Sequence, residues 1–401
     1  MPLAWIPAFA GMTGWGLIPP DQGFLRSTLG LASKTYYLQC AHRFAAACET
    51  GGMALCFKGF PVWTFIAGSL AIKVQNSTSR ELVNIESAPP RRRIALLLNP
   101  VAGRGRALAY GTALNRALLA AGAQTRVWEP SAADAIGRIA CEAARDRFDL
   151  MAAVGGDGTL AAAAGAVLDA GLSLAVAPAP AGTANVVARA LGYPLGNGRT
   201  ALDRLAAILA RAPFRRFDVV RLESAEAPPR RFLMSAGFGP DAEIVAAAHS
   251  ARRGPMTFGN YIRPIAKALF RRERPRARAW VDGVEAATGA TVGMAANFSL
   301  YAGWLRPCPA ADPSDGRLEL LAGAIDGWPG WLGWAWRLWR GTAAGLALAR
   351  TARGVRMEWR QETPGDRIPM QADGDPAGFL PARLEVEPGV LPMPAVSNFG
   401  S

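Results

Sequence analysis

One segment near the middle of the chain constrains the fold more than any other. Residues 149–154 are mainly apolar and predict a strand, and residues 160–170 are rich in alanine and predict a helix. Between them lies the turn Gly155-Gly156-Asp157-Gly158-Thr159. Three glycines in four positions allow positive φ angles and let the backbone approach a polyphosphate closely. A strand, a glycine turn and a helix in this order are typical of a phosphate-binding turn in an α/β sheet.

The polar side chains of this turn indicate what it binds. A carboxylate inside a phosphate cradle is costly unless a cation neutralises it, so Asp157 implies Mg²⁺ nearby. Thr159 is expected either to cap the following helix or to donate a hydrogen bond to a phosphate oxygen. The alternative interpretation is a tight glycine turn in which Asp157 serves only as a cap.

Two further strand–loop–helix units flank this turn. Residues 94–98 predict a buried strand that runs into Asn99-Pro100-Val101-Ala102-Gly103 and a helix over 107–122. Residues 174–177 predict a short strand that leads to a loop over 178–185 and a helix to residue 191. In that loop, Gly182 and Thr183 are expected to close over the ligand and Asn185 to brace the loop, although an ordinary strand-to-helix connection is the alternative. Because all three loops follow strand ends, the pattern predicts one ligand along one sheet edge.

The second half of the chain has a different pattern. Short strands are predicted at 216–222, 231–236, 276–282, 291–298, 317–322, 355–359 and 382–386, and helices at 240–250 and 259–271. Turn dipeptides such as Asp282-Gly283 separate several of them. The sequence therefore predicts an α/β, phosphate-binding domain over 91–214 and a mainly β domain, an antiparallel sheet with inserted helices, over 215–395. Residues 1–90 show neither a sustained period nor a motif, and we expect a poorly ordered extension, with a membrane anchor as the alternative.

The charge balance favours an anionic partner. The chain has 401 residues, with 44 Lys and Arg against 31 Asp and Glu, and a formal net charge of +13. Phosphate-bearing ligands and acidic membranes both fit this excess. No aromatic-interleaved basic strand or zinc-finger spacing indicates nucleic acid. Five cysteines without a C-x-x-C pair, and only two histidines, make a His/Cys metal site improbable and favour a reducing, cytoplasmic compartment.

The three loops together resemble a known family. Asn99-Pro100-x-x-Gly103, the glycine turn at 155–159 and Pro180-x-Gly182-Thr183-Ala184-Asn185 are similar to the signature of the diacylglycerol kinase catalytic domain. That superfamily also contains sphingosine kinases, ceramide kinases and bacterial lipid kinases. The resemblance covers about residues 91–386. It implies a nucleotide-binding α/β domain followed by a β-sandwich-like domain, with the active site in the cleft between them. It implies transfer of the γ-phosphoryl group of ATP to a lipid hydroxyl.

The resemblance extends to two acidic turns in the second half. It implies that Mg²⁺ is held by Asp312, Asp315 and the backbone carbonyl of Arg317, a set of hard oxygen donors; an ordinary hairpin turn is the alternative. Asp373-Gly374-Asp375 lies where the family usually carries Asp-Gly-Glu, whose Glu is the general base. Asp375 is shorter by one methylene, about 1.5 Å of reach, and Asp373 is the next candidate for the base.

A tryptophan-rich segment over 327–349 adds a membrane hypothesis. Its tryptophans at 328, 331, 334, 336 and 339 are accompanied by Arg337 and Arg340, a composition that suits a membrane interface as well as it suits a buried core or packing lid. Trp331 and Trp339 are expected near one side of the helix, and Trp328 before its start.

The sequence as a whole therefore predicts a cytoplasmic kinase of diacylglycerol or a similar lipid, in phospholipid biosynthesis, peripheral at the anionic inner membrane face. A homodimer is left open. The rivals are a NAD kinase-like enzyme, which shares the Gly-Gly-Asp-Gly turn, and a non-catalytic lipid- or nucleotide-binding protein.

Overall fold

The structure is a computed structural model that describes residues 71–73, 82–84, 91–131, 135–250, 263–265, 268, 274–343 and 349–396. Contacts divide the chain into two compact units, Met1–Pro89 and Pro90–Ser401. Within the first unit, β1 (Ala71–Lys73) pairs antiparallel with β2 (Leu82–Asn84). The remainder of the extension predicted over 1–90 lies outside the described residues, as does most of the helix expected at 259–271.

The first half of the second unit is built on a parallel sheet in the order β4-β3-β5-β6. The strands are β3 (Arg93–Leu98), β4 (Gln124–Trp128), β5 (Leu150–Gly155) and β6 (Ala175–Pro180). The helices are η2 (Ala102–Gly105), α3 (Ala107–Ala120), α4 (Ala135–Arg145), α5 (Asp157–Asp169), α6 (Val186–Ala190) and α7 (Arg199–Arg211). All three strands predicted here are present. Every residue of β5 is buried, as expected for a central parallel strand, and β6, at the edge of the sheet, is also fully buried.

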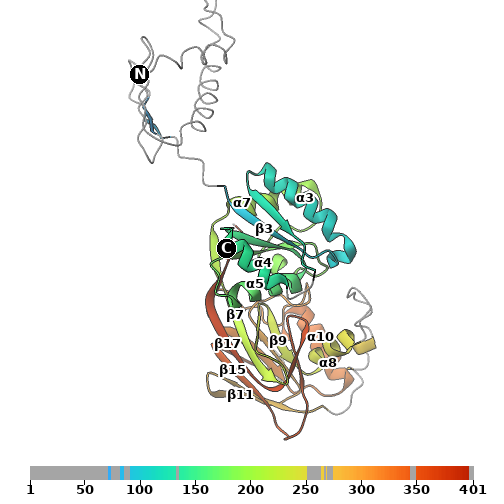
Figure 1. Cartoon of the computed structure of the whole chain (residues 1–401). Helices are drawn as coiled ribbons and strands as arrows, with labels where there is room; N and C mark the ends of the chain where they lie inside the picture. Colours follow the sequence, from blue (N-terminus) through green and yellow to red (C-terminus); the bar gives the residue numbers. More distant parts are fainter. Residues whose placement is uncertain are drawn as a thin grey trace, which may run out of the picture. The chain divides into compact units, whose positions relative to one another are not determined.

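The strand order fixes where a ligand can lie. From β3 the chain crosses to β4 at one edge, whereas from β5 it crosses to β6 in the opposite direction. Right-handed crossovers then place α3 on one face of the sheet and α5 on the other, and Figure 1 shows α3 beside α7 and α4 beside α5. The carboxyl ends of β3 and β5 flank the point where the direction reverses, which is the usual ligand site of open parallel sheets.

The second half is an antiparallel sheet of 11 strands, which confirms the predicted fold class. Its strands are β7 (Phe214–Ala225), β8 (Arg230–Phe232), β9 (Ser235–Phe238), β10 (Ala277–Val281), β11 (Val284–Ala290), β12 (Val292–Ala296), β13 (Leu318–Gly323), β14 (Ala349–Gly354), β15 (Arg356–Gln361), β16 (Pro369–Ala372) and β17 (Asp375–Pro394). Helices α8 (Pro240–Ser250) and α10 (Gly327–Arg340) accompany it.

Several predicted elements differ from the observed ones. The single strand expected at 231–236 is two strands, because the amides of Leu233 and Met234 between them donate to the Asp373 carboxylate instead of to a ladder. The strand expected at 382–386 is part of the much longer β17, and β11, β14 and β16 were not predicted. Trp328 lies inside α10, not before it.

One strand pair joins the two halves. The residues of β7 pair with β17 from Ala225↔Phe379 to Phe214↔Pro394 (Figure 1). At the far end of this ladder, Leu391 and Met393 are buried in the core of the parallel sheet. The Tyr193 hydroxyl, in the first half, donates to the Pro394 carbonyl. The end of β17 is therefore part of the α/β half.

Candidate functional site

The three predicted loops contact one another at the carboxyl edge of the parallel sheet. The Asn99 side-chain amide donates to the Thr159 hydroxyl at 3.0 Å, which ties the first loop to the second. The Gly155 carbonyl accepts from the amides of Ala181 and Gly182, which ties the second loop to the third. We call these residues (99–106, 155–159 and 180–185) the loop cluster.

Glycine is required in this cluster because the loops approach so closely. A Cβ on Gly182 would lie 2.5 Å from the Gly156 Cα and 2.9 Å from the Asn185 Oδ1. A Cβ on Gly103, which has a φ of +58°, would lie 2.2 Å from the Ala181 carbonyl oxygen. Both separations are below any normal contact, so a side chain at either position would force the loops apart.

Asp157 begins helix α5, three residues before the helix start that we predicted. Its two carboxylate oxygens accept the amides of Val186 and Val187, at 2.9 and 3.0 Å, at the start of α6. Burial raises the pKa of Asp157, and these two hydrogen bonds and Arg189 oppose the rise. The structure thus gives Asp157 a bridging and capping contact; its expected role toward Mg²⁺ stays a prediction.

Asn185 braces the third loop from within. It adopts a left-handed φ of 48°, and its side-chain amide donates to the Gly182 carbonyl at 2.9 Å. Its buried Oδ1 has no hydrogen-bond partner among the described residues. The cavity beside it, lined by Gly156, Asp157 and Asn185 among others, is only about 10 Å³. That space holds at most about one water, so a nucleotide would lie against the outer surface of the cluster.

That outer surface retains features that suit phosphate. Gly158 and Thr183 are exposed, and no described side chain caps the N-terminus of α5 at Gly156. Amides at an uncapped helix N-terminus, reinforced by the helix dipole, attract anions. The cluster therefore fits the polyphosphate of ATP, with Gly155, Gly156, Gly158, Thr159 and Thr183 as the predicted contacts.

The acidic turn of the second half (residues 312–317) contacts one further carboxylate, that of Asp218, which the sequence did not single out. Asp312 accepts two hydrogen bonds from Ser314, and Asp315 accepts the Arg317 amide at 2.9 Å and pairs with Arg353. Beneath the turn, the buried Asp218 accepts the amides of Gly316 and Gly389, both at 2.7 Å. Asp218 follows Phe217 in β7. A single carboxylate in an otherwise apolar run is the sequence feature that could have identified it.

The charges of this turn fit a hard cation. Burial raises the pKa of Asp218, and the negative charges of Asp315 and Asp312 raise it further. The same two factors, burial and Asp315, raise the pKa of Glu319, against Arg353. No three acidic, histidine or cysteine side chains within the described ranges are grouped as a metal site. A cation here would therefore need carbonyl or water oxygens besides Asp312 and Asp315, as the predicted Arg317 carbonyl would provide.

The two aspartates of the Asp373-Gly374-Asp375 turn have opposite environments. Both oxygens of Asp373 accept backbone amides, from Leu233, Met234 and Ser235, at 2.7–3.1 Å. Burial raises the pKa of Asp373 to about 6, against these hydrogen bonds, and the charge of Asp157 raises it further. Asp375 opens β17, and its side chain is 48% exposed. Asp373 is thus occupied in holding the chain, whereas Asp375 is accessible.

His249 is the functional candidate that sequence reasoning missed. Its Nε2, at the end of α8, lies 3.4 Å from the Asp375 Oδ1, and Arg230 lies 3.8 Å from the other oxygen. On the sequence alone the histidines are weighed only as metal ligands, and His249 is far from Asp375 in the chain. The available signal is the place of His249 as a polar residue in the last turn of the predicted helix 240–250.

Packing against the parallel sheet indicates where the aspartate turn lies. Leu233 and Met234, whose amides donate to Asp373, are buried in the core that the parallel sheet forms. Arg231 of β8, just before them in the chain, pairs with Asp169 at the end of α5. The turn that carries Asp375 therefore lies against the α/β half.

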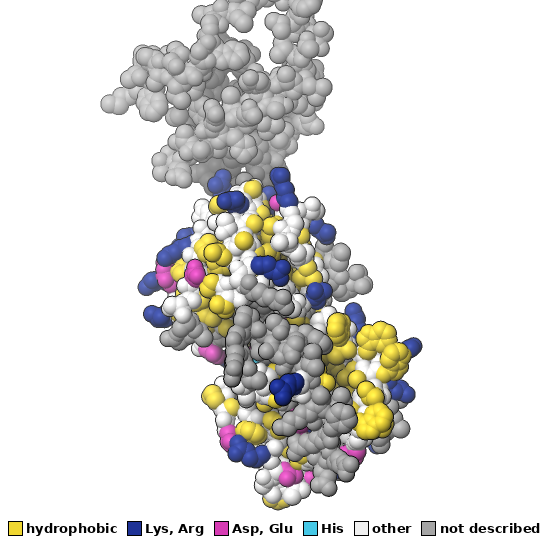
Figure 2. All heavy atoms as spheres, turned by 90° about the vertical axis from the view of Figure 1, so that its right-hand side faces the viewer, with side chains coloured by type: hydrophobic (Ala, Val, Ile, Leu, Met, Phe, Trp, Pro, Cys, Tyr) yellow, Lys and Arg dark blue, Asp and Glu magenta, His cyan; other side chains and the backbone are white. Residues whose placement is uncertain are grey.

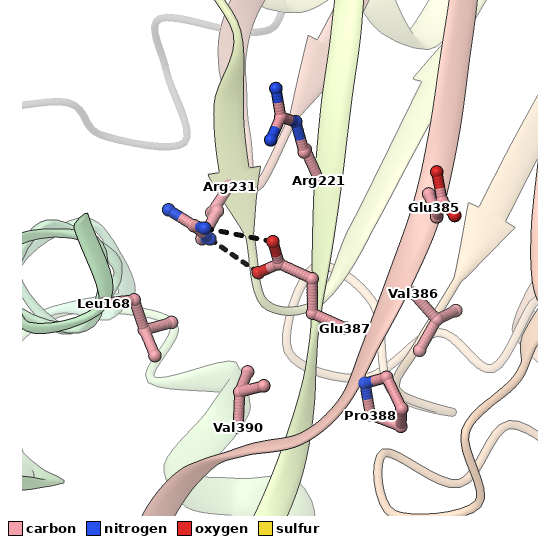
Figure 3. A pocket seen from close by; sticks show the side chains of 8 residues that line it. All are labelled: Leu168, Arg221, Arg231, Glu385, Val386, Glu387, Pro388 and Val390. Carbon is pink, nitrogen blue, oxygen red and sulfur yellow. Dashed lines mark hydrogen bonds and ion pairs between the residues drawn. The ribbon is translucent and has the colours of Figure 1, made fainter. Parts of the chain in front are cut away.

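A larger pocket lies elsewhere. It has a volume of about 550 Å³ and is lined by Arg231, Glu387 and Leu168, with Arg221, Glu385, Val386, Pro388 and Val390. Figure 3 shows Arg231 forming two hydrogen bonds to Glu387, at 2.6 and 3.0 Å, and Arg221 pairs with Glu223. Because its cations are already paired and no residue of the loop cluster lines it, we do not assign the nucleotide to this pocket.

A parallel sheet with a glycine-rich loop cluster, joined to an antiparallel sheet that carries the accessible carboxylate of Asp375, is the two-part architecture that the sequence resemblance implies. Comparison with protein families agrees. The family model of the diacylglycerol kinase catalytic domain matches residues 93–222, and that of the YegS C-terminal NAD kinase beta sandwich-like domain matches residues 234–395. The chain belongs to the diacylglycerol kinase catalytic-domain family, a family of lipid kinases.

Individual relatives cover most of the chain. Diacylglycerol kinase of Mycobacterium tuberculosis, from two strains, is 28% identical over 303 residues, which are 75% of this chain and 94% of the relative. The crystal structure of a diacylglycerol kinase from Bacillus anthracis str. Sterne has a TM-score of 0.58 at 16% identity and covers 77% of this chain and 99% of its own. A second crystal structure from that organism has a TM-score of 0.62 at 18% identity. These structures share the fold.

Proposed function

We propose that the protein transfers the γ-phosphoryl group of ATP to a hydroxyl of diacylglycerol or a similar lipid. Membership of a lipid kinase family supports the reaction class. The single observation that carries the proposal is the attachment of the Asp373–Asp375 turn to Leu233 and Met234, which lie in the core of the α/β half. An accessible carboxylate is thus held beside the half that contains the loop cluster.

In this proposal, the loop cluster binds and orients the triphosphate. The amides at the open N-terminus of α5, with Gly155, Gly156 and Gly158, donate to phosphate oxygens. Asn99, Gly103, Thr159, Gly182 and Asn185 keep the three loops in contact. Because phosphoryl transfer depends mainly on positioning and charge stabilisation, rigidity of these loops contributes directly to the rate.

Mg²⁺ would be held by Asp312, Asp315 and the Arg317 carbonyl, with Asp157 as a further carboxylate on the phosphate side. When bound, it neutralises negative charge on the triphosphate. The chain itself supplies negative charge for such a cation, from Asp312 and Asp315 in the acidic turn and from Asp218 beneath it.

Asp375 is the proposed general base. Its exposed carboxylate can accept the proton of the lipid hydroxyl, directly or through a water that offsets its shorter side chain. His249 and Arg230 hold it from two sides and fix its orientation. Asp373 positions the turn but has no oxygen free of backbone amides with which to reach a substrate.

The remaining expectations are part of the same proposal. The domain limits 1–90, 91–214 and 215–395, a cytoplasmic location at the inner membrane face and a homodimer stay predictions. Contact with an anionic membrane follows from the lipid substrate and the net charge of +13.

The test is transfer of labelled phosphate from ATP in the presence of Mg²⁺. Diacylglycerol, ceramide, sphingosine and NAD serve as separate acceptors, and Asp375→Asn as the matched negative control. We expect a labelled lipid with the wild type and at least a hundredfold less with Asp375→Asn. Labelling of NAD alone would favour the NAD kinase-like enzyme, and nucleotide binding without any transfer would favour a binding protein.

A further inference from the structure

Helix α10 has two faces that both consist largely of tryptophan. Trp331 and Trp334 are buried in a small core with Val292 and Leu321. On the other face, Trp328, Leu332, Trp336 and Trp339 follow one another at helical spacing and are between 53% and 60% exposed. Trp331 and Trp339, predicted near one side of the helix, therefore lie on different faces. We call Trp328, Leu332, Trp336 and Trp339 the Trp surface.

The Trp surface holds most of the exposed tryptophan of the described chain. Among the described residues, four tryptophans are exposed, and three of them belong to this surface. The fourth, Trp304, is 66% exposed and lies in the turn before Arg306, which packs against Gly341 at the end of α10. Large exposed apolar patches on soluble folds mark interaction sites.

The charge within α10 has one sign. The sequence of α10 contains no acidic residue, and Arg337 and Arg340 occupy its last turn, while Asp326, just before the helix, is paired with Arg276. The Arg340 guanidinium lies 5.8 Å from the ring of Trp336, whose ring is 5.0 Å from that of Trp339. Figure 2 shows a cluster of hydrophobic side chains on the second half of the molecule with Lys and Arg side chains at its border. A basic border complements an anionic partner.

We propose that the Trp surface docks the protein on an anionic lipid bilayer, with α10 lying in the plane of the interface. Tryptophan prefers the interfacial region of a bilayer, and arginine beside it pairs with lipid phosphates. The 14 residues of α10 span about 21 Å, short of the roughly 30 Å hydrocarbon core. Within the described ranges, no helix is long and apolar enough to cross a membrane. This proposal rests on the proposed lipid kinase function, because a lipid substrate would lie in the membrane.

Hydrogen bonds connect this region to the candidate base. Tyr301, in the turn that carries Trp304, donates to Asp241 of α8. The Gln371 side chain donates to the same carboxylate at 2.8 Å and accepts the Gly374 amide at 2.9 Å. Gly374 is the centre of the Asp373–Asp375 turn. Docking through the Trp surface would thus hold the candidate base at a fixed position relative to the bilayer.

The test measures sedimentation of the full chain with vesicles in the absence of ATP. Vesicles of phosphatidylcholine alone are compared with vesicles that also contain phosphatidylglycerol. We expect the double variant Trp336→Ser/Trp339→Ser to bind the anionic vesicles at least about tenfold more weakly than the wild type. Val284→Ser is the matched control, because Val284 is a 71% exposed apolar residue in β11, outside this surface. It should bind as the wild type does.

A second variant separates charge from apolar contact. Arg337→Gln/Arg340→Gln should remove the preference for the anionic vesicles while leaving the weaker binding to phosphatidylcholine unchanged. Equal vesicle binding by the wild type and the tryptophan variant overturns the proposal. So does a wild type that binds no vesicles but sediments as a dimer that the tryptophan variant dissociates, since a second copy would then cover the surface.

Transfer to a short-chain, water-soluble diacylglycerol is measured in parallel. Retained transfer by the tryptophan variant, with weakened vesicle binding, supports the docking role. Weakened vesicle binding in a protein that phosphorylates no lipid would leave the docking surface standing and reject the proposed function instead.

Discussion

The two parts of the candidate site are built in different ways. In the loop cluster, three short sequence motifs contact one another through backbone groups, and at Gly103 and Gly182 the close approach leaves no room for a side chain. In the aspartate turn, side chains from distant parts of the chain meet: Asp375 from β17, His249 from α8 and Arg230 from β8. In the proposed function, the first region binds the nucleotide through rigid loops, whereas the second acts through one exposed carboxylate.

This difference separates positioning from chemistry. Changes in the loop cluster should affect stability and ATP binding together, because the same contacts hold the loops and present the amides. Changes around Asp375 should affect transfer without affecting stability. The four substitutions that follow test this separation.

The largest effect is expected at the exposed carboxylate. Asp375→Asn removes the proton acceptor and should slow lipid phosphorylation at least a hundredfold, the lower range for loss of a general base. Its ATP affinity and thermal unfolding should remain those of the wild type. The side chain is 48% exposed, and ion pairs of exposed side chains contribute little to stability. Asp375→Glu, which restores the usual reach of the family, should retain most of the activity. Equal transfer by Asp375→Asn and the wild type would place the base elsewhere.

In the loop cluster, Gly182→Ala should destabilise the fold by about 2–3 kcal/mol and weaken ATP binding at least tenfold. The reason is the 2.5 Å separation between the added Cβ and the Gly156 Cα. Gly165→Ala is the control, because a Cβ there meets nothing within 4 Å and alanine favours a helix by about 0.5–1 kcal/mol. Calorimetry and nucleotide titration measure both. An unchanged Gly182→Ala protein would mean that the loops are separate in solution.

Asp373 sharpens the comparison because it lies in the aspartate turn but behaves as a structural residue. Asp373→Asn leaves backbone amides without an acceptor and should cost about 1–3 kcal/mol of stability, with transfer by the folded fraction largely retained. The loss should exceed that of Asp375→Asn in the same unfolding experiment.

The pH dependence of the stability of Asp373→Asn, compared with the wild type, tests the assignment of Asp373 independently. Because the pKa of Asp373 is raised to about 6 from an ordinary 3.8, its folded state binds a proton that the unfolded state has lost between these values. Protonated Asp373 therefore adds to the stability of the folded state below about pH 4, and this added stability is lost as the pH rises through 6. Wild-type stability should fall more steeply across this window than that of Asp373→Asn. Parallel curves would contradict the assignment.

The smallest effect is expected for His249. His249→Gln should reduce the rate of transfer roughly fivefold, with an unchanged KM for ATP, because Asp375 loses one of the contacts that orient it. Introduced together with Asp375→Asn, it should cause no further loss, since two residues that act through one carboxylate are not additive. A full additional fivefold loss in the double variant would show that His249 acts independently of Asp375.

The sequence predicted the α/β half more completely than the β half, for a physical reason. Strand, glycine turn and helix follow one another locally, so the three units and the contacts between their loops follow from the chain order and the sheet edge. Asp218 and His249 join their partners only through antiparallel pairing between distant strands, which a single sequence does not specify. The break between β8 and β9 depends on Asp373, more than a hundred residues further along the chain. Asp157 was predicted in the glycine turn, whereas the structure places it in the first turn of α5.

The path of β17 has a consequence for the synthesis of the protein. Leu391 and Met393 complete the core of the parallel sheet, and Pro394 accepts a hydrogen bond from Tyr193. Tyr193 and Pro394 are 201 residues apart in the chain, so the α/β half is translated well before the residues that complete its core. Until β17 has been translated, apolar surface of that half lacks its native cover, a condition that favours aggregation of a partly folded chain. A fragment that stops between the two family domains would therefore lack part of the core of its own sheet.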